Sequence, residues 1–142
     1  NHLRRGGTLL VLSSGRYPLF YPNQGQEAAK FGFRLQMVDS PAGSRVVFDP
    51  DFAHLKPWTM EKRGGSRLMD RNGYPDAKQY RSLARVLLPD GTPNGDAIAA
   101  VRPSGRLGNG RIVYVAGDLL RYPDRTRLLD AILQFVAADL PR

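Results

Sequence analysis

The chain has 142 residues, of which 42% are hydrophobic and 24% are charged, an ordinary globular composition that excludes wholesale disorder and fibrous repeats. Its length fits a single domain with its own core, and the absence of cysteine excludes disulfide scaffolds, thiolate nucleophiles and cysteine zinc sites. The formal net charge of +8 could attract phosphate or anionic glycans if the basic side chains gathered on one face.

No targeting or membrane segment is visible in the sequence. No apolar run approaches the roughly 18 residues that span a bilayer, and no signal-peptide core opens the chain. We therefore expect a soluble domain without a membrane span, and the compartment is left open. Because the chain begins at Asn1 without a methionine, we expect it to be a piece of a larger protein.

The N-terminal third predicts a strand, a helix and a second strand. The continuous apolar run Thr8–Leu12 is typical of a strand covered on both faces, as in a parallel α/β sheet. Asn23 and Gln26 have the spacing of a capping box, which predicts a helix over 24–31. Alternating apolar and polar residues over 33–38 predict the next strand.

The middle of the chain is less regular. A short strand is predicted at 45–48 and a brief helical turn at 49–55. Periodicity then fades, so we expect an irregular basic loop over 56–82. Its densest basic stretch, 56–71, holds five Lys and Arg residues against two acidic ones. A nucleic-acid site needs basic side chains fixed on one face with aromatic residues for stacking, so this stretch indicates a solvated loop and makes nucleic acid an unlikely partner.

The C-terminal third predicts three strands and a helix. The strands, at 83–88, 97–102 and 111–116, are separated only by turns, and parallel neighbours need a long crossover. They should therefore form an antiparallel meander. Pro123 suits the first position of a final helix, whose apolar residues recur at helical spacing and which should end near Asp139.

Ser13 and Ser14 are the strongest candidates for a nucleophile, because they follow a predicted buried strand. The elbow pattern G-x-S-x-G is absent, however, and the two histidines, His2 and His54, belong to different predicted elements. A serine nucleophile needs a base that an acid can orient. Small residues in a tight turn are the simpler interpretation.

Carboxylates and glycines offer weak signals for other chemistry. Asp49 and Asp51 could hold a hard cation, but they are more typical of a helix start. With 11 aspartates in the chain, a glycosidase-type pair drawn from Asp39, Asp49, Asp51 and Asp118 could arise by chance. Residues 105–110 superficially resemble a phosphate loop, yet they precede a strand and indicate a hairpin turn. We predict neither a metal site nor a cofactor.

The predicted ligand site lies where the strands end. In an open α/β sheet, ligands collect beyond the carboxyl ends of the strands. Ser14, Gly15, Arg16, Asp39 and Asp118 all follow predicted strands, and we expect them to line one crevice. Asp118 has an equally good alternative role, in which its carboxylate accepts backbone amides of a turn.

Two segments resemble parts of one family. Residues 3–12 (LRRGGTLLVL) look like the segment leading into the elbow strand of class I glutamine amidotransferase-like domains, which include trehalose-utilisation-type proteins and the trimerisation domain of some β-galactosidases. Residues 109–118 (NGRIVYVAGD) and the helix after them are similar to the closing part of those domains. The resemblance implies a flavodoxin-like three-layer α/β sandwich over 1–142, with a partly parallel sheet, an antiparallel C-terminal extension and a missing N-terminal part.

The catalytic residues of that family are absent. Active members use an elbow cysteine and a histidine-glutamate pair, where this chain has Ser13–Ser14 and Gly117–Asp118. The resemblance therefore implies a non-catalytic scaffold, interaction or small-ligand module of a larger protein of carbohydrate metabolism. The alternatives are a hydrolase of glycans or esters, with Ser13 or Ser14, Asp39 and Asp118 at its site, and a polyanion-binding module. Expected partners are other domains or subunits, including a second copy of this chain at an unpaired edge beside Thr8–Leu12.

Overall fold

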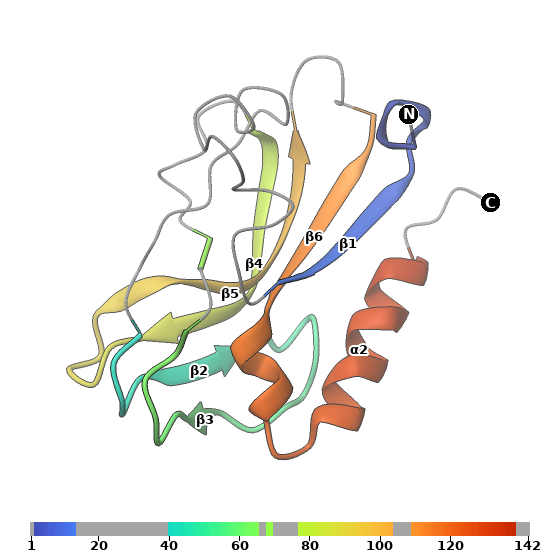
Figure 1. Ribbon diagram of the computed structural model, residues 1–142. Helices are drawn as coiled ribbons and strands as arrows, with labels where there is room; N and C mark the ends of the chain where they lie inside the picture. Colours follow the sequence, from blue (N-terminus) through green and yellow to red (C-terminus); the bar gives the residue numbers. More distant parts are fainter. Residues whose placement is uncertain (1, 14–39, 66–67, 70–76, 104–108, 139–142) are drawn as a thin grey trace.

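The computed structural model of the chain describes residues 2–13, 40–65, 68–69, 77–103 and 109–138. Within them, six strands form one sheet in the order β1-β6-β5-β4-β2-β3 (Figure 1). The elements, in chain order, are η1 (Leu3–Arg5), β1 (Thr8–Ser13), β2 (Arg45–Phe48), β3 (Trp58–Thr59), β4 (Ala77–Leu87), β5 (Pro93–Pro103), β6 (Arg111–Ala116), η4 (Gly117–Arg121) and α2 (Arg125–Ala138).

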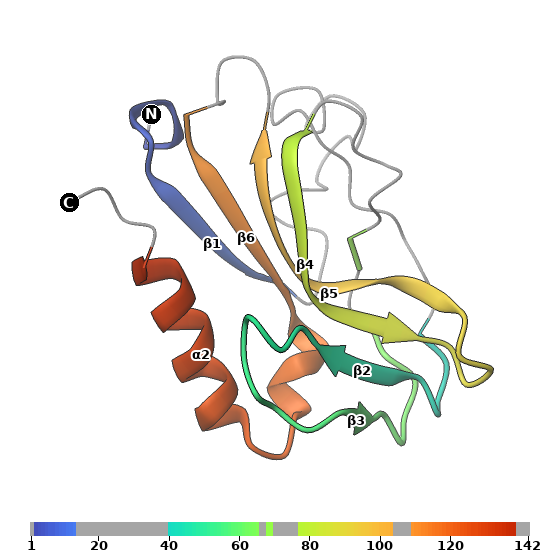
Figure 2. The ribbon, with the colours of Figure 1, turned by 180° about the vertical axis from the view of Figure 1, so that it is seen from behind.

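The sheet is mixed and strongly curled. β1 runs parallel to β6, with Thr8 opposite Arg111 and Ser13 opposite Ala116, whereas every other neighbouring pair is antiparallel. The long strands β4 and β5 continue from the upper part of the sheet into its lower part, where β2 and β3 lie (Figures 1 and 2). Register shifts along the β4–β5 pair accompany this bend, because bulges increase the local twist of a strand pair. The result is a half-barrel.

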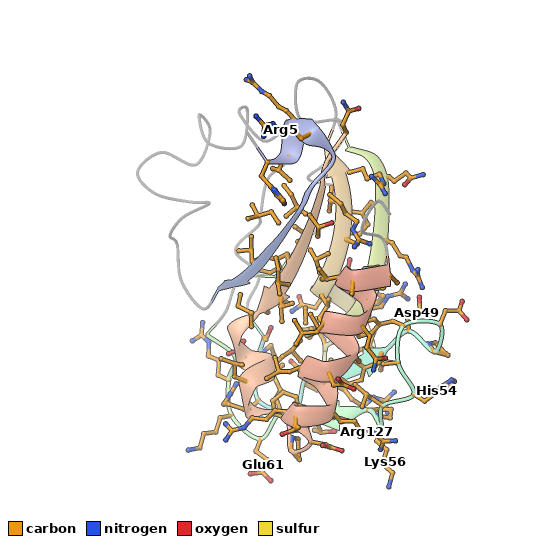
Figure 3. All side chains as sticks on the ribbon, turned by 90° about the vertical axis from the view of Figure 1, so that its right-hand side faces the viewer. Arg5, Asp49, His54, Lys56, Glu61 and Arg127 are labelled. Carbon is orange, nitrogen blue, oxygen red and sulfur yellow. The ribbon has the colours of Figure 1, made fainter. Side chains whose placement is uncertain are left out.

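The core lies along β6 and β5. All six residues of β6 are buried, as are Ala97 to Val101 of β5, whose small apolar side chains suit a strand covered on both faces. α2 lies against the sheet through Leu128 and Ile132, one helical turn apart (Figure 3). The opposite side of this helix faces solvent, as the exposed Leu133 shows.

The predicted fold class is wrong. In the described residues the protein is a curled half-barrel sheet with one α-helix, not a flavodoxin-like three-layer α/β sandwich. The continuous apolarity of Thr8–Leu12 indicated a strand covered on both faces inside a parallel sheet, but β1 lies at the edge of the described sheet and pairs only with β6. Val11 is buried and Leu12 is 46% exposed, so an apolar run does not by itself place a strand in the centre.

Several predicted elements are confirmed. The strands expected at 45–48, 83–88, 97–102 and 111–116 correspond to β2, β4, β5 and β6, and the last three form the antiparallel meander, with bounds that differ by several residues. The final helix ends at Ala138, and it begins at Arg125 rather than at Pro123. The helix predicted at 24–31 and the strand at 33–38 lie outside the described residues.

The irregular loop predicted over 56–82 is wrong at both ends. β3 lies near its start, and the first half of β4 lies at its end. Leu68 and Met69 are buried, and Met69 exchanges backbone hydrogen bonds with Asp96 on β5. Such short segments do not produce a periodic pattern, so they could not be predicted from the sequence.

η1 is held against the start of β6 by a close backbone approach. A Cβ atom on Gly110 would lie 2.5 Å from the Leu3 carbonyl oxygen and 2.7 Å from its Cα, so only glycine fits there. The next amide, that of Arg111, donates to the carbonyl oxygen of Gly7 at 3.1 Å. The antiparallel pairing of β5 and β6 agrees with a hairpin turn between them, although residues 104–108 of that turn lie outside the described residues.

Candidate functional site at the ends of the parallel strands

The parallel pair β1–β6 brings two predicted site residues to one edge of the sheet. Ser13 ends β1 opposite Ala116, the last residue of β6, and Asp118 follows two residues later in η4. The strands end together because parallel neighbours run in the same direction, which is the placement that the sequence predicted. We call the group formed by Ser40, Gly64, Gly65, Asp118 and Arg121 the strand-end corner.

The Asp118 carboxylate ties three segments of the chain together. Its Oδ1 atom accepts a hydrogen bond from the Gly65 amide at 3.0 Å. The same atom forms an ion pair with the Arg121 guanidinium at 3.4 Å. Gly64 in turn forms an antiparallel bridge with Ser40, whose carbonyl oxygen accepts the Gly64 amide at 2.7 Å. The segments around Ser40 and Gly64 are thereby fixed on η4.

Gly64 allows this close approach. A Cβ atom at this position would lie 2.6 Å from Asp118 Oδ2 and 3.0 Å from Ser40 Cβ, distances that carbon atoms do not tolerate. Ser40 is fully buried, and its Oγ atom has no hydrogen-bond partner among the described residues. The corner is thus closely packed around the carboxylate.

We expect Gly64→Ala to lower the free energy of unfolding by about 2 kcal/mol, the usual range for overpacking a filled site. The added methyl group must displace the Asp118 carboxylate and so weaken its bond to the Gly65 amide. Urea denaturation measures the change. Gly65→Ala is the matched control, because a Cβ atom there meets nothing within 4 Å and the amide is retained. Equal losses for the two variants would contradict this account.

The other predicted site residues fall in different places. Ser14, Gly15, Arg16 and Asp39 lie outside the described residues, so the crevice expected around them is not described. Asp118 accepts a backbone amide, as its alternative role required, but from Gly65 rather than from the turn that follows it.

The histidines and the other candidate ligands do not join the strand-end corner. The Nε2 atom of His2 lies 3.0 Å from the Thr8 carbonyl oxygen, and His54 is exposed. The Asp49 carboxylate accepts the Asp51 amide at 2.8 Å, but only a turn over 50–52 follows, so the helical turn predicted at 49–55 is wrong. Within the part of the chain that the structure describes, no group of three or more His, Asp or Glu residues could hold a metal ion.

An aromatic cluster contacts the strand-end corner through Arg121. The Arg121 guanidinium lies 6.0 Å from the centre of the Trp58 ring, which meets the Tyr122 ring edge-on. Phe48 also meets Tyr122 edge-on, at 5.2 Å between ring centres, and the Tyr122 hydroxyl donates to the Lys56 carbonyl oxygen at 3.0 Å. Trp58 therefore anchors β3 to η4.

The Tyr122 phenol links stability to alkaline pH. Burial raises the pKa of Tyr122 above its ordinary value of 10.0, and the Asp124 charge acts in the same direction. Below the ordinary pKa the phenol is protonated in both the folded and the unfolded chain, whereas above it the unfolded chain loses the proton first. Stability therefore falls as the pH rises above about 10.

Tyr122→Phe should cost about 1 kcal/mol at pH 7, where it removes the hydrogen bond to Lys56. The same variant cannot ionise, so its disadvantage should shrink at pH 11. Chemical denaturation of both proteins at the two pH values measures this. A disadvantage at pH 11 equal to or larger than that at pH 7 would contradict the assignment.

A second polar cluster, which the sequence analysis missed, lies between β4 and β5. Asp96 is only 7% exposed, and its two carboxylate oxygens accept hydrogen bonds from the Tyr80 hydroxyl at 2.5 Å and the Ser82 hydroxyl at 2.6 Å. The signal that could have revealed it is a lone aspartate at the start of the apolar run of one strand, with Tyr80 and Ser82 two residues apart on the neighbouring strand. We assign this cluster a structural role, because each carboxylate oxygen is engaged by a neighbouring strand.

Comparisons with protein-family models, with curated protein sequences and with solved structures gave no match. None of the helices in the described residues has the length and apolar character needed to cross a membrane. The fold and the site define the class of the protein. It is a curled mixed half-barrel in which the Asp118 carboxylate, just beyond the ends of the parallel strands, binds the Gly65 amide.

Proposed function

We propose that this chain is a non-catalytic scaffold, interaction or small-ligand module of a larger protein. The observation that carries the proposal is the bond between the Asp118 carboxylate and the Gly65 amide. This acidic group lies just beyond the shared end of two parallel strands, and it is used to hold two remote segments together.

The geometry around Asp118 favours this structural use. Oδ1 is engaged by an amide and a guanidinium, and Oδ2 lies against the backbone of Gly64. A catalytic acid or base must come within hydrogen-bond reach of the substrate. The similarity to class I glutamine amidotransferase-like domains rests on sequence motifs alone and stays a prediction.

A test separates this proposal from the hydrolase alternative. The chain is incubated with a fluorophosphonate probe and with p-nitrophenyl acetate, and the same assays are run on Ser13→Ala, Ser14→Ala and Asp118→Asn. We expect no stoichiometric labelling, and we expect hydrolysis that does not change among the four proteins. Labelling of either serine, together with a rate loss of about a hundredfold in its variant, would contradict the proposed module role and favour the hydrolase.

A second candidate function, polyanion binding, is favoured by the exposed basic side chains at the lower end of the molecule. Figure 3 shows Lys56 and Arg127 there, together with the acidic Glu61. The exposed basic residues in and beside β3, η4 and the start of α2 are Lys56, Lys62, Arg63, Arg121, Arg125 and Arg127. Heparin binding that weakens steeply between 50 and 200 mM salt would support this candidate, since counterion release makes such binding salt-dependent. Heparin binding that does not change with salt, or no heparin binding at all, would contradict polyanion binding as a function.

A further inference from the structure

A hollow of about 270 Å³ opens between β2 and β4, away from the strand-end corner. It is lined by Val47, Phe48, Asp49, Pro50, Ser82, Leu83, Arg85 and Leu87. Every one of these residues belongs to the described part of the chain. Ligand sites commonly measure roughly 300–1,000 Å³, so this hollow, just below that range, would take only a molecule of a few heavy atoms.

Most of the lining is apolar. In the antiparallel β2–β4 pair, Val47 stands opposite Arg85, and Arg45 opposite Leu87. Val47, Arg85 and Leu87 therefore share one face of the pair, because opposite residues point to the same side and alternate residues along a strand do as well. Apolar side chains and a cation thus border the same hollow.

Two of the three polar lining residues are already engaged within the protein. The Asp49 carboxylate accepts the Asp51 amide and pairs with Arg81 at 3.9 Å. The Ser82 hydroxyl donates to Asp96. Arg85 is exposed, and no side-chain partner for it is found in the described part of the chain. Its guanidinium is the lining group that a ligand can engage.

We infer that this hollow binds a small organic carboxylate with an apolar body, and that Arg85 is its binding residue. A guanidinium presents donors in a planar fork that matches a carboxylate, and the apolar side chains beside it accept a hydrocarbon. The net charge of +8 favours the arrival of an anion. The inference goes beyond the proposed module role, which rests on Asp118 at a different place in the fold.

Hexanoate is the probe that tests the inference, because it joins a carboxylate to a short alkyl chain. Titration of the full 142-residue chain, followed by NMR, should shift the amides of 47–49 and 82–87 in a saturable manner. Hexylamine carries the same alkyl chain with the opposite charge, and acetate carries the carboxylate without the chain. Both should bind at least tenfold more weakly than hexanoate.

Arg85→Gln should weaken hexanoate binding at least tenfold. Arg5→Gln is the matched control, because Arg5 is an exposed arginine of η1, far from Asp49 (Figure 3), that does not line the hollow, and it should leave binding unchanged. Circular dichroism checks that both variants fold; if Arg85→Gln does not, Arg85→Lys, which should weaken binding several-fold, takes its place. Equal binding of hexylamine, shifts elsewhere in the chain, or no effect at Arg85 would overturn the inference and leave the proposed module role intact.

Discussion

Replacing Arg111 with alanine should lower the free energy of unfolding by about 4 kcal/mol, because hydrogen bonds to a charged group are each worth roughly 1.5–3 kcal/mol and a cation over a ring adds about 1 kcal/mol. Arg111 begins β6 and is buried. Its guanidinium donates to the carbonyl oxygens of Phe135 at 3.4 Å and Val136 at 3.2 Å, and lies 4.8 Å from the centre of the Phe135 ring.

The physical reason for this loss lies at the end of α2. The last carbonyl groups of an α-helix lack partners within the helix and carry partial negative charge. α2 has no basic residue in its own last turn, so the sheet supplies the cation instead. Removing it leaves helix carbonyls uncapped and opens a space between α2 and β6. Urea denaturation of the variant measures the change.

Arg81→Ala is the control for this prediction. Arg81 also lies over the Phe135 ring, at 5.5 Å, but its side chain is 46% exposed and pairs with Asp49 only at 3.9 Å. Its loss should cost less than about 1 kcal/mol, as exposed pairs usually do. If Arg111→Ala were as mild as Arg81→Ala, the cap on α2 would not contribute as we describe.

Replacing Asp96 with alanine should lower the free energy of unfolding by about 3 kcal/mol, in the range for breaking a buried hydrogen-bond network. The substitution removes the carboxylate that accepts two short hydrogen bonds. The hydroxyls of Tyr80 and Ser82 then lose this acceptor. Asp96→Asn should cost less, since its side-chain oxygen still accepts one of the two bonds. Chemical denaturation of both variants tests the order.

Asp90→Ala is the matched control in the same hairpin. Asp90 is exposed, and its carboxylate accepts the Thr92 amide at 2.8 Å. Losing that bond should cost well below the loss at Asp96, because solvent replaces it. Tyr80→Phe and Ser82→Ala each remove one donor to Asp96, and each should show a smaller effect than Asp96→Ala. An Asp96 loss no larger than that of Asp90 would refute the network.

The elements with strong periodicity were predictable. The alternation and turn signals around β4, β5 and β6 predicted an antiparallel meander, and helical spacing predicted α2 to within two residues at each end. These patterns report which residues share a face. They do not report how far a sheet bends, and the curl of β4 and β5 depends on register shifts that have no periodic signature.

The position of β1 was not predictable from its composition. A run of apolar residues shows that a strand avoids water, and β1 does so by packing on the core beside β6 while lying at the edge of the described sheet. The sequence analysis took burial on two faces as evidence of a parallel α/β sheet, although it also expected an unpaired edge beside Thr8–Leu12. These are independent properties, which is why the fold class was wrong although several strands were right.

The candidate site was predictable only where chain direction determines it. Asp118 follows a strand that is parallel to β1, so the shared strand end was foreseeable. Its partner Gly65 is 53 residues away, in a segment without a periodic pattern. Asp96 and Arg111 were missed because a single charged residue in an apolar strand has the same local signature whether it is solvated or buried.

The parallel pairing of β1 with β6 also dictates an order of assembly. β4, β5 and β6 are joined by short connections, whereas Thr8 and Arg111 are about 100 residues apart along the chain. Closing so long a loop costs more chain entropy than forming a hairpin, so the meander can nucleate first and β1 should dock late. Until it docks, one side of the apolar strand β6 offers free amides and carbonyls to any other extended polypeptide, which makes the nascent chain prone to aggregate at that stage.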